Sequence, residues 1–129
     1  MAGSKCITIN VKGLQNAQRR TNIFETFKSL DFDIIAIQET HCDKKSVDQW
    51  MNEWDHHSLW SIGSSEKCGV GFLVGKNLQA ELIYHVIAFK ERFLRADVKI
   101  QGIVYQLINI YGTNATTEAQ IFSKKSLNS

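Results

Sequence analysis

The chain contains no proline among its 129 residues, and it has only three cysteines. No Pro-rich linker divides it, and its length suffices for one domain with a hydrophobic core but not for two. The odd number of cysteines, without the spacing of a disulfide framework, favours free thiols in a reducing compartment. We therefore expect a single domain located in the nucleus or cytoplasm and not secreted.

Long apolar runs and strong charge are also missing. No apolar segment approaches the ~18 residues that a membrane span requires, and the first residues lack the apolar core of a signal peptide, so we expect no membrane partner. The formal net charge of +2 does not by itself require a nucleic acid as partner, so DNA binding would depend on a local basic patch. An apolar content of 43% favours a folded chain over a disordered one.

Apolar spacing in the first half of the chain predicts a strand–helix–strand unit. Alternation over residues 6–11 predicts a strand, and apolar residues at helical spacing over 23–30 predict a helix. The β-branched run at 34–38 predicts a buried second strand. Two strands joined through a helix are expected to be parallel neighbours. A second, short helix is expected over residues 47–54.

The second half of the chain predicts an antiparallel meander. Gln101-Gly102 between two apolar segments is a tight-hairpin signal. Residues 115–129 are polar and weakly patterned, which predicts a fraying helix. The whole predicts a mixed α/β (α+β) fold with two helices and about six or seven strands. The strands expected in this half are 60–63, 69–74, 80–89, 93–100 and 103–111.

Glu39 is the residue that points most directly to chemistry. It follows the apolar run 34–38, where a buried carboxylate is costly unless it is paired or binds a cation. Asn10 and Tyr111 also end expected strands, with Asn114 close behind, and strand ends are where open α/β folds bind ligands. Mg²⁺ is typically held by one or two carboxylates together with amide oxygens, waters and substrate phosphate. Asn10 and Glu39 suit that division, with Tyr111 donating to a phosphate oxygen.

Other roles for these residues remain open from spacing alone. Glu39 could be a strand-terminal acid paired with Arg19, Arg20 or a lysine. Asn10 could simply bond the turn that follows it, a common habit of asparagine. Tyr111 could be a core aromatic whose hydroxyl reaches the rim. The basic pair Arg19-Arg20 could be a solvated helix face or could face a ligand.

Five segments of the chain form a recognisable series in order and spacing. They are Ile7-Thr-Ile-Asn-Val-Lys-Gly-Leu14, Arg20 before an amphipathic helix, Ile37-Gln-Glu-Thr-His41, Gly69-Val-Gly-Phe-Leu-Val74 and Leu107-Ile-Asn-Ile-Tyr-Gly-Thr-Asn114. The series resembles the N-terminal half of the endonuclease/exonuclease/phosphatase superfamily. Within this family of exonuclease III-like and apurinic endonucleases, the similarity is greatest to LINE-type retrotransposon endonucleases. It covers residues 5–118 and leaves 119–129 as a polar tail.

The resemblance implies a deoxyribonuclease-like αββα four-layer sandwich, truncated here to about one sheet plus two helices. It also implies hydrolysis of DNA phosphodiesters that depends on Mg²⁺ (or Mn²⁺). At the matching positions, Asn10 and Glu39 would hold the metal, and Tyr111 with Asn10 would act on the scissile phosphate. The residues that would bind DNA are Asn114, Lys12 and Arg20.

The segment after Tyr111 lacks the remaining groups that the resemblance predicts. The family's Asp-x-Asn motif, a later metal-site Asp and an Asp-His pair should follow, whereas residues 112–129 contain neither Asp nor His. General-base catalysis contributes a factor of about 10²–10⁴. The chain is therefore expected to be inactive by itself: a truncated nuclease or a catalytically dead remnant that binds nucleic acid or protein.

A truncated sandwich would also leave one sheet face uncovered. Such a large apolar patch predicts self-association. The residues expected on that face include Ile35, Ile37, Phe72 and Val74.

Overall fold

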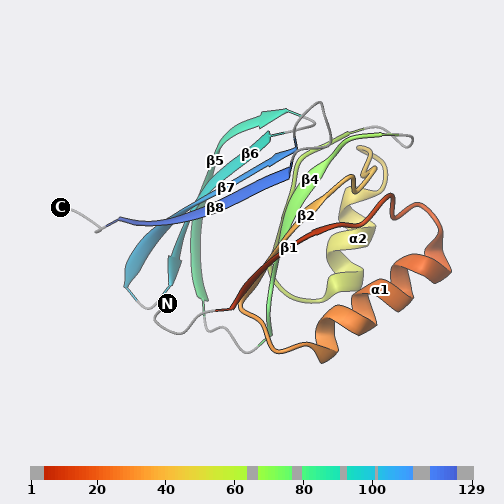
Figure 1. The fold of residues 1–129 in the computed structure, drawn as a ribbon, viewed down its shortest axis with the longest axis horizontal. Helices are drawn as coiled ribbons and strands as arrows, with labels where there is room; N and C mark the ends of the chain where they lie inside the picture. The colour runs from red at the N-terminus through yellow and green to blue at the C-terminus, as the bar shows by residue number, and fades with distance from the viewer. Residues whose placement is uncertain are drawn as a thin grey trace.

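The computed structural model describes residues 5–63, 67–76, 80–90, 93–100, 102–111 and 117–124. These residues form two helices and eight strands. Figure 1 shows three layers: both helices lie on one side of the first sheet, and the second sheet lies on the other side. In chain order the elements are β1 (Cys6–Asn10), α1 (Ala17–Ser29), β2 (Ile34–Gln38), α2 (Val47–Trp54), β3 (Ser58–Trp60), β4 (Val70–Val74), β5 (Ala80–Lys90), β6 (Phe93–Ile100), β7 (Ile103–Tyr111) and β8 (Thr117–Lys124).

The first sheet has the strand order β1-β2-β4-β3. β1 and β2 are parallel, as the strand–helix–strand unit predicts, with Asn10 opposite Gln38 at their carboxyl ends. β4 is antiparallel to both β2 and β3. Every residue of β2 and β4 is buried, because these central strands are covered on both faces. β1 stands at the edge and is only partly buried.

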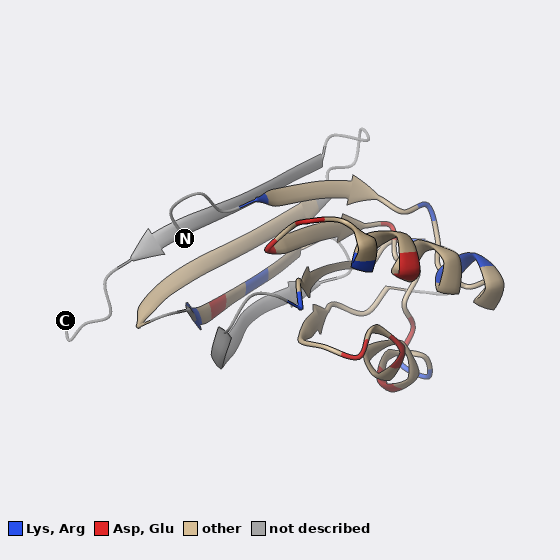
Figure 2. Cartoon of the chain, turned by 90° about the horizontal axis from the view of Figure 1, so that it is seen from below, with Lys and Arg blue, Asp and Glu red and all other residues tan. Residues whose placement is uncertain are grey.

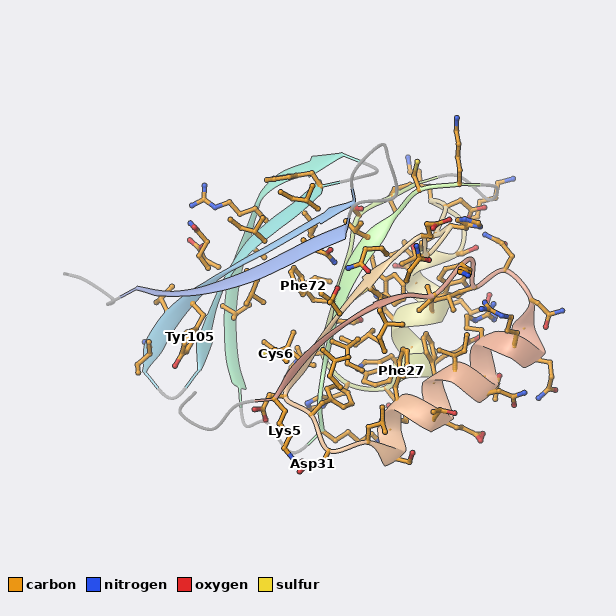
Figure 3. The ribbon with its side chains drawn as sticks, in the orientation of Figure 1. Lys5, Cys6, Phe27, Asp31, Phe72 and Tyr105 are labelled. Carbon is orange, nitrogen blue, oxygen red and sulfur yellow. The ribbon has the colours of Figure 1, made fainter. Side chains whose placement is uncertain are left out.

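The helices cover one face of this sheet with aromatic side chains. α1 begins after Asn16, whose side-chain oxygen accepts a hydrogen bond of 2.9 Å from the Arg19 amide, the usual role of asparagine at this position. Phe27 of α1 points towards the sheet (Figure 3). Leu30, expected on the same apolar stripe, lies beyond the end of the helix and is 43% exposed. The residues that form this core are Leu14, Phe24, Phe27, Phe32, Ile35, Ile37, Trp50, Trp54 and Leu73, with smaller neighbours.

The second sheet, in the order β5-β6-β7-β8, covers the other face of the first. Consecutive strand residues point to opposite faces, so Ile35 packs under the helices while its neighbours Ile34 and Ala36 pack against the second sheet. Phe72 lies between the sheets and is fully buried (Figure 3). From the second sheet, this core receives Leu94, Ala96, Val98, Tyr105 and Leu107.

The prediction of an uncovered inner face is therefore wrong. Ile35, Ile37, Phe72 and Val74 are each at most 3% exposed, because the helices cover one side and the second sheet covers the other. The mixed α/β class is confirmed, but the chain forms two four-stranded sheets and not about one. Self-association through that face loses its physical basis.

The predicted helix at residues 115–129 is also wrong. Thr117–Lys124 forms β8, which pairs antiparallel with β7 from Tyr111↔Thr117 to Val104↔Lys124. A weak local pattern left the state of this segment to be decided by pairing with a neighbouring strand. Among the helices described, none combines the length and the apolar character that crossing a bilayer requires.

Candidate functional site

The carboxyl ends of β1 and β2 bring Asn10 and Glu39 together. The two strands are parallel and in register, so the residues that end them meet at one edge of the sheet. The Asn10 side-chain Nδ2 donates a hydrogen bond to Glu39 Oε2, and both residues are half-buried. The two side chains therefore lie side by side, as a shared metal site would require. Their role in holding a metal ion stays a prediction.

Asn10 also bonds the turn that follows it. Its Oδ1 accepts a hydrogen bond of 2.9 Å from the Lys12 backbone amide. The two readings of Asn10, as a turn residue and as a partner of the carboxylate, are therefore compatible in one geometry. The turn fixes the amide so that its nitrogen faces Glu39. An amide oxygen has two lone pairs, so Oδ1 retains acceptor capacity beyond the Lys12 contact.

Glu39 stands on a backbone that other loops hold in place. Glu39 and Lys12 have left-handed φ angles of 52° and 53°, a conformation that costs residues with side chains of order 1–3 kcal/mol. Hydrogen bonds on both sides fix it: the Gly13 amide donates to the Glu39 carbonyl at 2.6 Å, and the Thr40 amide donates to the Gly69 carbonyl at 3.0 Å. The direction of the Glu39 side chain is thus set by tertiary structure.

The donor set at this edge fits a hard, weakly held cation. Glu39 supplies one carboxylate, an oxygen ligand that Mg²⁺ takes alongside waters and substrate phosphate, and Asn10 turns its amide nitrogen towards that carboxylate and its oxygen towards the Lys12 amide. Among the described residues, no three His, Cys, Asp or Glu side chains gather into a group that could hold a metal by themselves. The arrangement therefore suits a cation completed by substrate, and does not suit a closed structural site.

The nearby cysteine is chemically inert. Cys42 is fully buried, and burial, followed by the charge of Asp43, raises the pKa of its thiol to about 12. A neutral thiol is neither a nucleophile nor a metal ligand at neutral pH. All three cysteines are free, as their number and spacing predicted.

Arg19 and Lys12 border the candidate site. The Arg19 guanidinium donates to the carbonyls of Gly13 and Val11, the latter at 2.7 Å, and so ties the loop after β1 to the start of α1. Lys12 is exposed on that loop, next to Asn10. Its predicted role in binding DNA stays a prediction.

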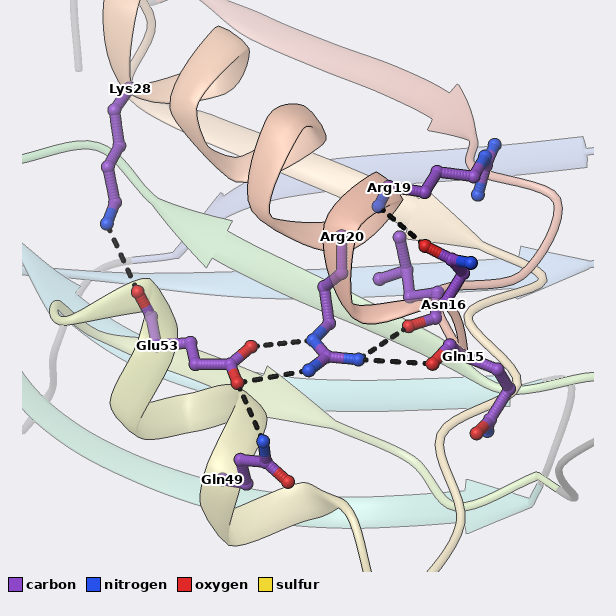
Figure 4. Close-up of polar contacts among 8 residues, drawn as sticks. Gln15, Asn16, Arg19, Arg20, Lys28, Gln49 and Glu53 are labelled. Atoms are coloured by element: carbon purple, nitrogen blue, oxygen red, sulfur yellow. Dashed lines mark hydrogen bonds and ion pairs between the residues drawn. The ribbon is translucent and has the colours of Figure 1, made fainter.

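Arg20 is buried between the two helices. It is 4% exposed, and its guanidinium donates to both carboxylate oxygens of Glu53, at 2.6 and 3.0 Å (Figure 4). A third donor reaches the Leu14 carbonyl at 2.9 Å, and the group stacks 5.0 Å from the centre of the Trp50 ring. These contacts give Arg20 a structural position, and they offer no support for the predicted contact with DNA.

Tyr111 is the last residue of β7, and the structure describes its backbone but not its side chain. Asn114 lies outside the described residues. The role of each at the scissile phosphate or the DNA backbone stays a prediction. β7 does contribute a residue that the sequence reasoning missed, Asn109, which is fully buried and bonded to Gln38. Its signal was a polar side chain that alternates with Tyr105 and Leu107 on the inward face of the strand.

A groove of about 750 Å³ runs between α1 and β1, with Asn10 in its wall. Its floor is apolar, and it includes Ile9 and Phe27. No Asp or Glu is among its lining residues, so the groove itself carries no negative charge. The polar lining residues are Asn10, Asn16, Gln18, Arg19, Asn22 and Thr26. Outside the groove charges are mixed, with α1 and β6 each carrying both signs (Figure 2).

Comparison with known proteins gives two matches. The sequence model of a family described as "Endonuclease/Exonuclease/phosphatase family" matches residues 7–105. The match includes Asn10 and Glu39 and ends before Tyr111. A protein of Xenopus laevis named "Transposon TX1 uncharacterized 149 kDa protein" is 25% identical over 120 residues, which are 92% of this chain. The aligned part is 9% of that protein's length, so the chain spans a small fraction of this relative.

Proposed function

Because the chain belongs to the endonuclease/exonuclease/phosphatase family, we propose that it carries the first part of a retrotransposon-type endonuclease site, which hydrolyses DNA phosphodiesters with a divalent metal. The family supports a nuclease-type function in general terms, and the similarity to a transposon protein supports the retrotransposon branch. The observation that carries the proposal is the hydrogen bond between Asn10 and Glu39 at the ends of two parallel strands.

Glu39 and Asn10 would hold Mg²⁺ (or Mn²⁺). Divalent-metal dependence is general in the family, and the cation supplies stabilisation of charge on the phosphate oxygens when it is bound. The protein's part is to fix the ligands: Asn10 orients the Glu39 carboxylate, and the strained turn at residue 39 fixes where that carboxylate points.

DNA is the proposed substrate. The residues that line the groove include Arg19 and several amide side chains but no carboxylate, so a polyanion meets amide groups and a guanidinium there. Phosphate contacts of this kind position nucleic acid without reading its sequence. Tyr111 and Asn114 would add contacts to the scissile phosphate and the DNA backbone.

Hydrolysis needs a group that activates or orients the attacking water. Residues 112–129 supply neither Asp nor His for that task. We therefore propose that these 129 residues by themselves bind metal and DNA without cutting, and that cleavage requires catalytic groups from elsewhere.

Metal binding tests the proposal directly. Mn²⁺ titration followed by water-proton relaxation is expected to show a site that Glu39→Gln abolishes and Asn10→Ala weakens. Asp48→Asn, which removes an exposed carboxylate from α2, serves as the control and should leave binding unchanged. Equal Mn²⁺ affinity in the wild type and the Glu39→Gln variant would exclude the site.

A catalytically dead remnant that binds nucleic acid is the second candidate, favoured by the carboxylate-free groove. It predicts an electrophoretic shift of DNA that weakens with salt and persists when Glu39 is replaced and metal is removed. The nuclease proposal instead predicts that Mn²⁺ strengthens the shift only when Glu39 is present.

A further inference from the structure

Asn109 places a fully hydrogen-bonded amide between the two sheets. It is 0% exposed and follows Leu107 on the inward face of β7. Its Nδ2 donates to the backbone carbonyls of Ile37 and Gly71, at 3.1 and 2.8 Å, and its Oδ1 accepts from Gln38 Nε2 at 2.9 Å. Burying an amide is tolerated only when its bonds are made, and these bonds are made across the sandwich.

The carbonyls that Asn109 contacts belong to residues that face each other. Ile37 of β2 and Gly71 of β4 are partners in the first sheet, so one side chain of β7 attaches to both central strands at the same level. Apolar packing between sheets permits sliding, whereas three directional bonds define one alignment. Asn109 thus fixes where the end of β7 lies over the end of β2.

Gln38 links Asn109 to β1 through a second hydrogen bond. It is 0% exposed, and besides its bond to Asn109, its Nε2 donates to Thr8 Oγ1 at 3.0 Å. Its other side-chain atom, Oε1, is buried without a hydrogen-bond partner among the described residues. An unsatisfied buried acceptor lowers stability and so offsets part of what the two bonds donated by Nε2 contribute.

Each of the three residues in this hydrogen-bond network lies one or two positions before a candidate site residue. Thr8 lies two positions before Asn10 on β1, and Gln38 directly precedes Glu39 after β2. Asn109 lies two positions before Tyr111 on β7. The bonds therefore join three strands at the point where each one delivers its candidate residue.

We propose that Gln38 and Asn109 are positioning residues, which hold the ends of β1, β2 and β7 together so that Asn10 and Glu39 meet at one metal site beside the end of β7. The inference rests on the proposed function for the chemistry at that site. The positioning itself is a property of the fold and can be measured without it.

Asn109→Ala and Leu107→Ala form the first comparison. Both remove a fully buried side chain from the same face of the same strand, so both should lower stability. Only Asn109→Ala is expected to weaken Mn²⁺ binding, by about 10- to 100-fold, the range for groups that orient metal ligands. It should also speed native-state hydrogen exchange at the Gly13 and Thr40 amides, which flank Glu39, beyond the change in global stability.

Gln38→Leu is the second comparison. Leucine removes both donated bonds and the unsatisfied oxygen, but it leaves the buried Asn109 Oδ1 without its donor, so it should lower stability by no more than Asn109→Ala does. Its Mn²⁺ affinity should fall further than that of Leu107→Ala, which shows how far a loss of stability alone changes the binding. This variant carries the test if Asn109→Ala does not fold.

The outcomes separate the two claims. Wild-type exchange at the Gly13 and Thr40 amides in both Gln38→Leu and Asn109→Ala overturns the positioning role. If Glu39→Gln leaves Mn²⁺ binding unchanged, the proposed function fails, while exchange at those two amides still decides whether Gln38 and Asn109 fix the Glu39 loop.

Discussion

Glu39 and Lys12 adopt left-handed backbone conformations on neighbouring loops, and Gly13, the residue after Lys12, joins the two loops. Its amide donates to the Glu39 carbonyl, and its own φ of 88° is one that glycine adopts readily. The position is also crowded, because a Cβ there would lie 2.7 Å from His41 Nδ1. Position 13 therefore favours glycine for two reasons, the left-handed φ angle and the lack of space for a Cβ. This glycine supports the strained backbone at Glu39 through its hydrogen bond.

Gly13→Ala should destabilise the protein by more than about 1 kcal/mol and weaken Mn²⁺ binding, because both φ and the contact with His41 oppose a methyl group. Urea unfolding and Mn²⁺ titration measure the two effects. Gly102→Ala is the matched control, with a φ of 81° but no atom within 4 Å of the added carbon. Equal costs for the two substitutions would show that crowding against His41 contributes nothing.

Single-residue roles were the least predictable from the sequence. The sequence of the Arg19-Arg20 pair predicts a basic helix surface. In the structure, the Arg19 guanidinium binds a carbonyl of the loop after β1, and Arg20 is buried against Glu53. The sequence contains no signal for that difference, because it depends on how α2 packs beside α1. Asn10 and Glu39 could be placed together, because parallel strands bring their carboxyl ends to one edge.

Glu53 joins the two helices through polar contacts. Its carboxylate accepts hydrogen bonds from Arg20 and from Gln49 one turn earlier, while its carbonyl accepts from Lys28 at 3.1 Å (Figure 4). The bond from Arg20 is the main reason that the pKa of Glu53 lies below its usual value of 4.5, against an opposing effect of burial. Arg20 also donates to the Leu14 carbonyl, so the pair is tied to the loop between β1 and α1.

Glu53→Gln should cost about 1.5–3 kcal/mol, the range for hydrogen bonds to charged groups, because Arg20 stays buried without its counter-charge. A carboxyl whose pKa is lowered in the folded state contributes stability above its unfolded pKa and loses it as pH falls through the folded value. Wild-type stability should therefore decline below pH 4.5, and the variant should show less of this decline. Urea unfolding at pH 7, 5 and 4 measures it.

Asp31→Asn provides the control at this scale. It removes an exposed ion pair, Lys5–Asp31 at 2.7 Å, whose side chains are 60% and 78% exposed. Solvent screens exposed ion pairs, so this substitution should change the free energy of unfolding little. If Asp31→Asn lowers the free energy of unfolding as much as Glu53→Gln does, the burial of Arg20 is not the reason that its pair with Glu53 stabilises the protein.

For the molecule as a whole, local periodicity was enough to predict the elements but not their layers. Helical spacing and alternation located both helices and most strands, because each pattern reflects which face is buried, although α1 begins at Ala17, before its first apolar residue at helical spacing. β8 depends on pairing with β7, and the order of the first sheet depends on partners far along the chain, and the pattern within each segment does not record these pairings. Hence the sequence predicted an exposed face where the second sheet lies.

The core between the two sheets makes them one cooperative unit. Phe72 sits between them, opposite Ala36 and Leu59, and Phe72→Ala should cost about 3–5 kcal/mol. Fluorescence of Trp50 and Trp54, which lie in the other core under the helices, should report the same shifted urea midpoint as far-UV circular dichroism.

Ile62→Ala, at a position 39% exposed, is the control and should shift neither signal appreciably. A Phe72→Ala variant whose circular dichroism midpoint falls while its tryptophan midpoint stays would mean that the second sheet unfolds alone. The bonds from Asn109 could not then hold β7 over the Glu39 loop whenever that sheet is open, and the candidate site would exist only part of the time. Coincident midpoints are expected instead, because the core between the sheets and the core under the helices share the strands β2 and β4.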